Sequence, residues 1–258
     1  MRNVQTVAAN TFREAVRDRV LYNLVFFALL MIGAAILVGQ VSIGIERDVI
    51  VSLGLTAISV VGILIAVFLG VALVSKEMDK RTLYALLAKP VKRWEFLLGK
   101  FAGLVMTLTV NTAAMAAGLY IALWSVQRAW QPSDIYILTA VYLIVLKLAL
   151  IVALALLFSC FTTPFLAILF TIGIYITGLL AGDLRTVRGV VIDPGTLKMM
   201  RGISYVLPNF ENFNVMSAAV HGRGVPSAIV WQATLYAVLY IAIVLTGAAI
   251  VFSRRNLK

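Results

Sequence analysis

The sequence has little charge for its length, which excludes most soluble folds. Only 13% of its 258 residues are charged, whereas soluble domains carry about a quarter. Hydrophobic residues make up 62% of the chain. This shortage of charge beside an excess of apolar residues predicts an integral membrane protein, with residues 1–258 as one polytopic domain.

Cysteine and histidine each occur once, as Cys160 and His221. A single cysteine cannot form an internal disulfide, and a single histidine excludes a zinc site built from histidines. The glycine-rich phosphate loop and the H-E-x-x-H motif are also missing from the sequence. We therefore predict no catalytic residue, no metal site and no cofactor in this chain, so that ATP and magnesium would be bound by a separate subunit.

Long apolar runs dominate what is present. A helix needs about 20 apolar residues to cross the hydrocarbon of a bilayer. Six stretches qualify and predict an all-α fold with six transmembrane helices: 20–41, 50–74, 101–124, 135–158, 165–181 and 228–252. Residues 1–19 carry an apolar stripe at helical spacing, which predicts an interfacial helix, although a charged leader to the first span is the alternative.

Basic residues indicate the orientation of these spans. With both termini in the cytoplasm, the inner side has four basic residues in the leader, seven in segment 75–100 and three at the C-terminal end. The outer loops have seven, and Lys147 lies within a span. This asymmetry favours cytoplasmic termini in a cell (inner or plasma) membrane. It also accounts for the net charge of +11 without nucleic acid as a partner.

Segment 75–100 is a charged island between two apolar stretches. Its leucines and Trp94 recur at helical spacing, and Pro90 prevents one continuous helix. We predict two short helices that join at Lys89 and Pro90 on the cytoplasmic face. A solvated loop with ordinary basic charge is the alternative, but it explains neither the apolar stripe nor the proline.

The island resembles the cytoplasmic loop of ABC-2 type transporter permeases, most closely the branch associated with multicopper-enzyme (nitrous oxide reductase) maturation. The leader and the C-terminal tail also resemble that branch. The residues that carry the resemblance are Glu77-Met-Asp79, Arg81-Thr82-Leu83, Leu86-Leu87, Lys89-Pro90-Val91, Arg93, Glu95-Phe96-Leu97-Leu98, Gly99-Lys100, Thr11-Phe12-Arg13-Glu14-Ala15 and Phe252-Ser-Arg254-Arg255-Asn256.

This resemblance implies a half-transporter with the fold of ABC-2 (type V) exporters. Two permease chains would pair, as a homodimer or with a close relative, and would bind two copies of an ABC ATPase subunit. A coupling helix in loop 75–100 would contact the ATPase. Leu83, Leu86 and Leu87 would form the docking face, and Glu77, Arg81 and Arg93 would set its orientation. The full set of proposed coupling residues is Glu77, Arg81, Thr82, Leu83, Leu86, Leu87, Pro90, Arg93 and Glu95.

Two pairs of glycines, Gly99 with Gly103 and Gly178 with Gly182, place small residues one helical turn apart. Such spacing favours close helix packing in lipid, although it also arises by chance in a glycine-rich chain. Lys147 lies near the middle of the fourth span, where an unpaired charge is costly. We predict that it lines the translocation path with Asn111; the alternative is a structural lysine that pairs within the bundle.

The outer loop 182–227 is long and half apolar, so it would fold on the outer surface or dip into the bilayer. It is a candidate contact for an extracytoplasmic protein, or else a solvated cap. The sequence thus favours the permease subunit of an exporter driven by a separate ATPase. A scaffold or regulator of an ATPase that transports nothing is the main alternative. The lack of paired catalytic groups disfavours an intramembrane enzyme, and the single charge within the spans disfavours a secondary transporter.

Overall fold

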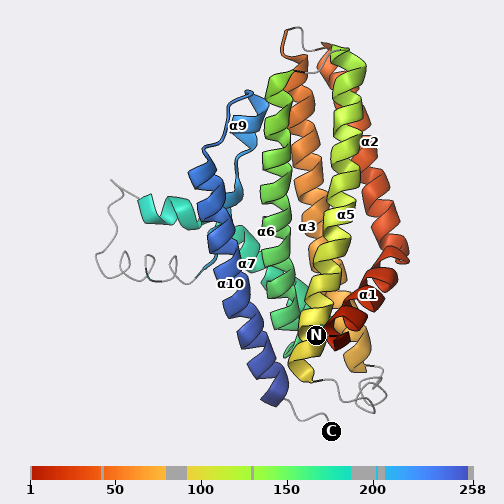
Figure 1. Cartoon of the computed structure of the whole chain (residues 1–258), viewed down its shortest axis with the longest axis vertical. Coiled ribbons are helices and arrows are strands. Elements are labelled where there is room, and N and C mark those ends of the chain that lie inside the picture. The colour runs from red at the N-terminus through yellow and green to blue at the C-terminus, as the bar shows by residue number, and fades with distance from the viewer. Residues whose placement is uncertain are drawn as a thin grey trace.

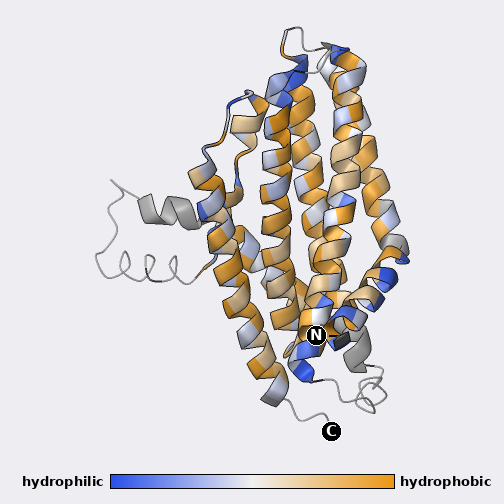
Figure 2. Cartoon of the chain, in the orientation of Figure 1, coloured by the Kyte–Doolittle hydropathy of each residue, from blue (hydrophilic) through white to orange (hydrophobic). Residues whose placement is uncertain are grey.

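A computed structural model describes residues 2–41, 44–79, 92–128, 131–186, 202 and 207–254. Every regular element in these ranges is helical, which confirms the predicted all-helical class. The long helices run side by side in an elongated bundle (Figure 1). Hydrophobic residues cover the middle of this bundle, and hydrophilic residues gather toward its two ends, as expected of a multi-pass membrane protein (Figure 2).

Within the described ranges the elements follow one another as an N-terminal helix, a series of long apolar helices and a short irregular stretch before the last helix. They are α1 (Arg2–Val16), α2 (Arg19–Val41), α3 (Glu46–Asp79), α5 (Arg93–Gln127), η1 (Pro132–Asp134), α6 (Ile135–Ser159), α7 (Pro164–Thr186), η2 (Phe210–Phe213), α9 (Met216–Val220) and α10 (Ser227–Arg254).

Four helices of the described residues are long and apolar enough to cross a membrane: Glu46–Leu73 of α3, Arg93–Gln127 of α5, Pro132–Ser159 and Ser227–Ser253. Two shorter apolar helices, Leu24–Gly39 and Pro164–Leu180, lie within α2 and α7. These six elements correspond to the six predicted stretches.

Helices α3 and α6 form the centre of the bundle. Residues 148–156 of α6 are buried without interruption, so this part of α6 is surrounded by protein on all sides. Helix α10 covers one side of the bundle. Many of its large apolar side chains are exposed, including Trp231 and Ile243. An exposed apolar face of this kind is suited to lipid or to a second chain.

The two short helices predicted around Pro90 need a correction. Helix α5 begins at Arg93 and continues without a break to Gln127, so the part after Pro90 is the start of the third apolar helix rather than a separate element. Helix α3 likewise continues to Asp79. Pro90 and the predicted coupling residues Arg81, Thr82, Leu83, Leu86 and Leu87 lie outside the described residues.

The stretch 207–226 packs against the bundle through a few buried side chains, while many of its other residues are exposed. It packs η2 against α6 and α7, and α9 against α3 and α6. Phe210 and Phe213 are buried, at 1% and 2% exposure, as expected of anchors inside the protein. Helix α9 lies beside α6 near one end of the bundle (Figure 1).

Candidate functional site

Helix α1 lies directly on the first turns of α5, at the end of the bundle where α10 also finishes (Figure 1). A Cβ atom added at Gly99 would lie 2.6 Å from Cβ of Val7, and one added at Gly103 would lie 2.6 Å from the carbonyl oxygen of Ala8. The absence of side chains at both glycines therefore brings the two helix backbones together. Val7, Thr11 and Ala15 form the buried face of α1.

An ion pair that is buried only on the Lys100 side reinforces this contact. The Lys100 ammonium lies 3.5 Å from Glu14 Oε2 and 5.8 Å from the centre of the Phe96 ring. The Lys100 side chain is only 3% exposed, whereas Glu14 is 45% exposed. The pair therefore joins the buried side of α5 to the solvent-exposed side of α1. The solvent around Glu14 weakens the attraction between the two charges.

Glu95 joins the start of α5 to the start of α1. Its Oε2 accepts hydrogen bonds from the backbone N–H of Lys92, at 3.0 Å, and from Asn3 Nδ2, at 3.3 Å. Glu95 precedes the apolar part of α5. The two hydrogen bonds hold the pKa of its carboxyl below the ordinary value. An acidic group at this position also favours the helix N-terminus, where backbone N–H groups have no partner within the helix.

Arg93 joins the start of α5 to the end of α10. Its Nη1 donates to the carbonyl oxygens of Phe252, at 2.8 Å, and Ser253, at 3.1 Å. The guanidinium also lies 5.8 Å from the centre of the Phe252 ring, which stacks on Phe96. We call the set Asn3, Arg93, Glu95, Phe96, Lys100 and Phe252 the junction. It ties α1 and α10 to the point where segment 75–100 enters α5.

The predicted coupling residues thus have three outcomes. Arg93 and Glu95 meet in the junction, where their described contacts go to other parts of this chain. Glu77 lies in the last turns of α3, but its side chain falls outside the described residues. The six predicted coupling residues between α3 and α5 also lie outside them.

A second feature is the narrow contact between α7 and the stretch 207–226. At Gly178 an added Cβ would overlap the carbonyl oxygen of Pro208, and Phe210 packs against Tyr175 with ring centres 5.2 Å apart. The backbone N–H of Asn209 donates to the Tyr236 hydroxyl of α10 at 2.8 Å. Gly178 therefore admits this stretch rather than a helix. Gly182 is part of α7, but its surroundings are outside the described residues.

Lys147 lies near the middle of α6 and has a partner on α3. Its Nζ donates to Ser59 Oγ at 2.6 Å. Asn111, predicted beside Lys147, is buried on α5, and its Nδ2 has no hydrogen-bond partner among the described residues. No hydrogen bond within the described part of the chain joins Asn111 to Lys147.

Arg47 and Asp134 hold the C-terminal part of the stretch 207–226 in place. Sequence reasoning did not identify either residue as part of a site. Arg47 donates to Asp134 Oδ1 through Nε and Nη2, both at 3.2 Å, and to the Val220 carbonyl at 2.6 Å. The side chains of Arg47 and Asp134 are 14% and 5% exposed. Because 87 residues separate the two in the chain, no local pattern pointed to the pair.

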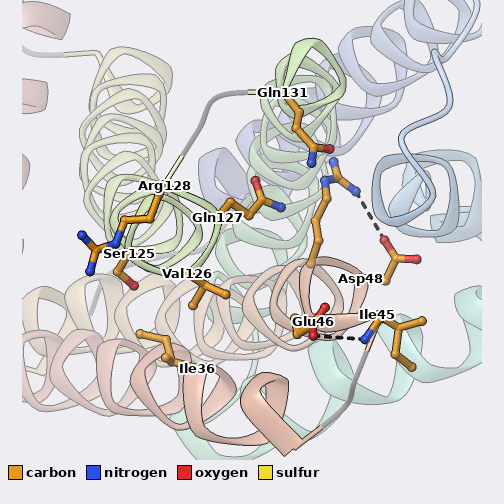
Figure 3. A pocket seen from close by; sticks show the side chains of 11 residues that line it. Ile36, Ile45, Glu46, Asp48, Ser125, Val126, Gln127, Arg128 and Gln131 are labelled. Carbon is orange, nitrogen blue, oxygen red and sulfur yellow. Dashed lines mark hydrogen bonds and ion pairs between the residues drawn. The ribbon is translucent and has the colours of Figure 1, made fainter.

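Close to this pair, a polar pocket of about 1020 Å³ opens between the ends of α2, α3 and α5. Glu46 and Asp48 come from the start of α3, and Gln127 and Arg128 from the end of α5 (Figure 3). Both amide atoms of Gln127 are buried without a hydrogen-bond partner among the described residues. Across the described ranges, no group of three or more His, Cys, Asp or Glu residues is placed to hold a metal ion.

Comparison with known families gives one match that covers almost the whole chain. The model described as ABC-2 family transporter protein matches residues 5–257. No curated protein matches the sequence.

Proposed function

This chain belongs to the ABC-2 family of transporter proteins, and we propose that it is the permease subunit of an exporter driven by a separate ATPase subunit. A membrane component of such a transporter needs energy from ATP. Because no phosphate-binding loop occurs in this sequence, a separate subunit must bind the ATP. The observation that supports the proposal best is the junction, which connects three helices at the base of the segment that resembles a coupling loop.

We place six transmembrane helices in the bilayer: α2, α3, α5, α6, α7 and α10. Helix α1 lies in the cytoplasmic interface of the cell membrane, and both termini face the cytoplasm. The excess of basic residues in the leader, in segment 75–100 and at the C-terminal end supports this orientation. It puts the junction on the cytoplasmic side and the Arg47–Asp134 pair on the outer side.

Two ATPase subunits, with their ATP and magnesium, would bind the loops 75–100 of two permease chains. A motor changes the conformation of a permease only if it binds the two states with different free energies. Displacement of segment 75–100 would reach α1 through Glu95 and Lys100, and α10 through Arg93. Closure of the ATPases would in this way move both flanks of the bundle together and expose the path lined by Lys147 and Asn111.

The second permease chain is proposed to be a copy of this one, with the apolar faces exposed on the bundle as its contact. The outer loop 182–227 remains a candidate contact for an extracytoplasmic protein. Several residues of this loop, including His221 and Arg223, are exposed and available for such a contact.

Replacement of Leu86 and Leu87 by Asp tests the proposed ATPase contact. Charged residues on an apolar docking face leave carboxylates without partners, so co-purification of the ATPase with the tagged chain should fall strongly. Arg223→Asp on the outer side, where Arg223 is exposed, is the matched control and should leave recovery unchanged. Undiminished recovery with Leu86→Asp/Leu87→Asp at normal expression would refute docking at this segment.

A further inference from the structure

A polar surface lies where the stretch 207–226 meets α3 and α6. Its members, which we call the inner polar face, are Thr56 and Ser59 of α3, Lys147 of α6, and Glu211 and Asn214 of the stretch. Lys147 is about 18 Å along α6 from Ile135, at 1.5 Å per residue. Since the hydrocarbon core is about 30 Å thick, this cluster is close to the bilayer centre.

Lipid is an unsuitable neighbour for this surface. Thr56, Glu211 and Asn214 are exposed on the single chain, and Lys147 is partly exposed. Charged groups at this depth face a bundle interior or a water-filled cavity, because hydrocarbon cannot solvate them. The inner polar face should therefore border water, most simply in the cavity between two permease chains.

Lys147 retains capacity to bind an anion. An ammonium group has three N–H donors, and the described contacts use one of them on Ser59. The Ser59 side chain is fixed by this bond and is 7% exposed, so it holds the ammonium in one place. A carboxylate or phosphate oxygen that approaches Lys147 could accept from its remaining N–H donors.

Glu211 is the acidic residue of η2, which packs against α6, and its described side-chain bond stays within its own stretch. Its Oε1 accepts from Asn214 Nδ2 at 3.2 Å, and Asn214 belongs to the same stretch. The anchors of the stretch lie on either side, at Phe210 and at the Val220 carbonyl. The carboxylate can thus move away from Lys147 without loss of those anchors.

We propose that Lys147 and Ser59 form a binding site for an anionic group of the transported molecule, a carboxylate or a phosphate, and that Glu211 is a tethered counter-ion which the cargo displaces. The site rests on the proposed permease function and adds the chemical class of the cargo. A neutral or cationic cargo would gain nothing from Lys147, whereas an anion would replace Glu211 with little change in local charge.

Charge-selective thiol labelling tests this site in the full chain with its ATPase in membranes. Thr56→Cys, in a Cys160→Ser background, places a reporter beside Ser59 and leaves Lys147 intact. The probes are the anionic sulfonatoethyl and the cationic trimethylammonioethyl methanethiosulfonates, both confined to water. We expect the anionic probe to react on the order of tenfold faster relative to the cationic one than it does with a free thiol.

Three further variants identify the cause of that preference. Lys147→Met should abolish it, Lys147→Arg should retain it, and Glu211→Gln should increase it. Val110→Cys is the matched control, since Val110 is 49% exposed near the middle of α5, away from the inner polar face, and neither probe should label it. The site is refuted if neither probe labels Thr56→Cys, or if the preference survives Lys147→Met.

Failure of this site is distinguishable from failure of the permease assignment. ATPase co-purification should be normal in the Lys147→Met variant, because the described bond of Lys147 goes to Ser59 of α3 and not to the junction. Normal recovery without charge preference would remove the anion site and leave the motor contact in place. Loss of recovery in Lys147→Met would also count against the site, because it would give Lys147 a general structural role.

Discussion

At the scale of single residues, Gly178 has the clearest structural reason for its identity. We predict that Gly178→Ala destabilises the protein by about 1–3 kcal/mol, because the added methyl group overlaps the Pro208 carbonyl and Phe210. The midpoint of thermal unfolding in lipid nanodiscs measures the effect. Gly173→Ala in the same helix is the control, since a Cβ at Gly173 meets no atom within 4 Å. Equal midpoints for the two variants would contradict the close contact.

The Arg47–Asp134 pair gives a second prediction at this scale. Asp134→Asn removes the charge that faces a nearly buried guanidinium and should cost about 1–3 kcal/mol of unfolding free energy. Arg47→Gln alone should cost a similar amount, and the double variant less than the sum, because both changes break the same interaction. Strict additivity in this double-mutant cycle would show that the pair does not stabilise the outer end.

Sequence reasoning identified Lys147 because a charge within an apolar run is conspicuous at any position. It could not identify Ser59 as the hydrogen-bond partner, because Ser59 is one of several small polar residues within the apolar run of α3. Contacts between distant segments, such as Arg47 with Asp134, leave no periodic or local trace. Only the folded backbone brings these residues together.

At the scale of elements, the junction makes Arg93 the tie between α5 and α10. We predict that Arg93→Ala leaves ATPase co-purification intact. It should lower ATP hydrolysis by the reconstituted complex severalfold, because a movement of α5 is no longer transmitted to α10. Arg223→Ala, exposed on the outer side, serves as the control. Loss of co-purification would instead place Arg93 at the docking surface, and unchanged hydrolysis would make the tie irrelevant to coupling.

Hydropathy located the apolar helices well and their polar ends poorly. The stretch predicted at 135–158 is α6, Ile135–Ser159, since polar residues bound it closely. The stretch predicted from residue 101 begins at Arg93, because capping by Glu95 and packing against α1 extend the helix beyond its apolar part. The half-apolar stretch 207–226 has no clear helical or strand periodicity. Its packing against α3, α6 and α7 could therefore not be predicted from the sequence.

At the scale of the whole molecule, the orientation in the membrane is a direct prediction. Cysteines introduced at the exposed positions Lys92 and Gln131 should react from opposite sides of the cell membrane. An impermeant maleimide added to intact cells should label Gln131→Cys, and Lys92→Cys only after permeabilisation. The reverse pattern would put segment 75–100 outside and remove the basis for a cytoplasmic motor.

At one end of the bundle the junction joins α1, α5 and α10, and at the other end Arg47 binds Asp134. Helix α5 begins in the junction and ends beside the polar pocket. Between these ends, Lys147 of α6 donates to Ser59 of α3. This arrangement suits a permease that a motor on one face opens toward the other.

Site-specific photocrosslinking from position 86 in living cells tests the central claim most directly. A photoreactive amino acid in place of Leu86 should capture an ABC ATPase subunit, identified by mass spectrometry, and the same probe in place of Arg223 should not. A probe at position 86 that captures only lipid, or only a protein from outside the cell, would contradict the claim that a cytoplasmic ATPase drives this chain through segment 75–100.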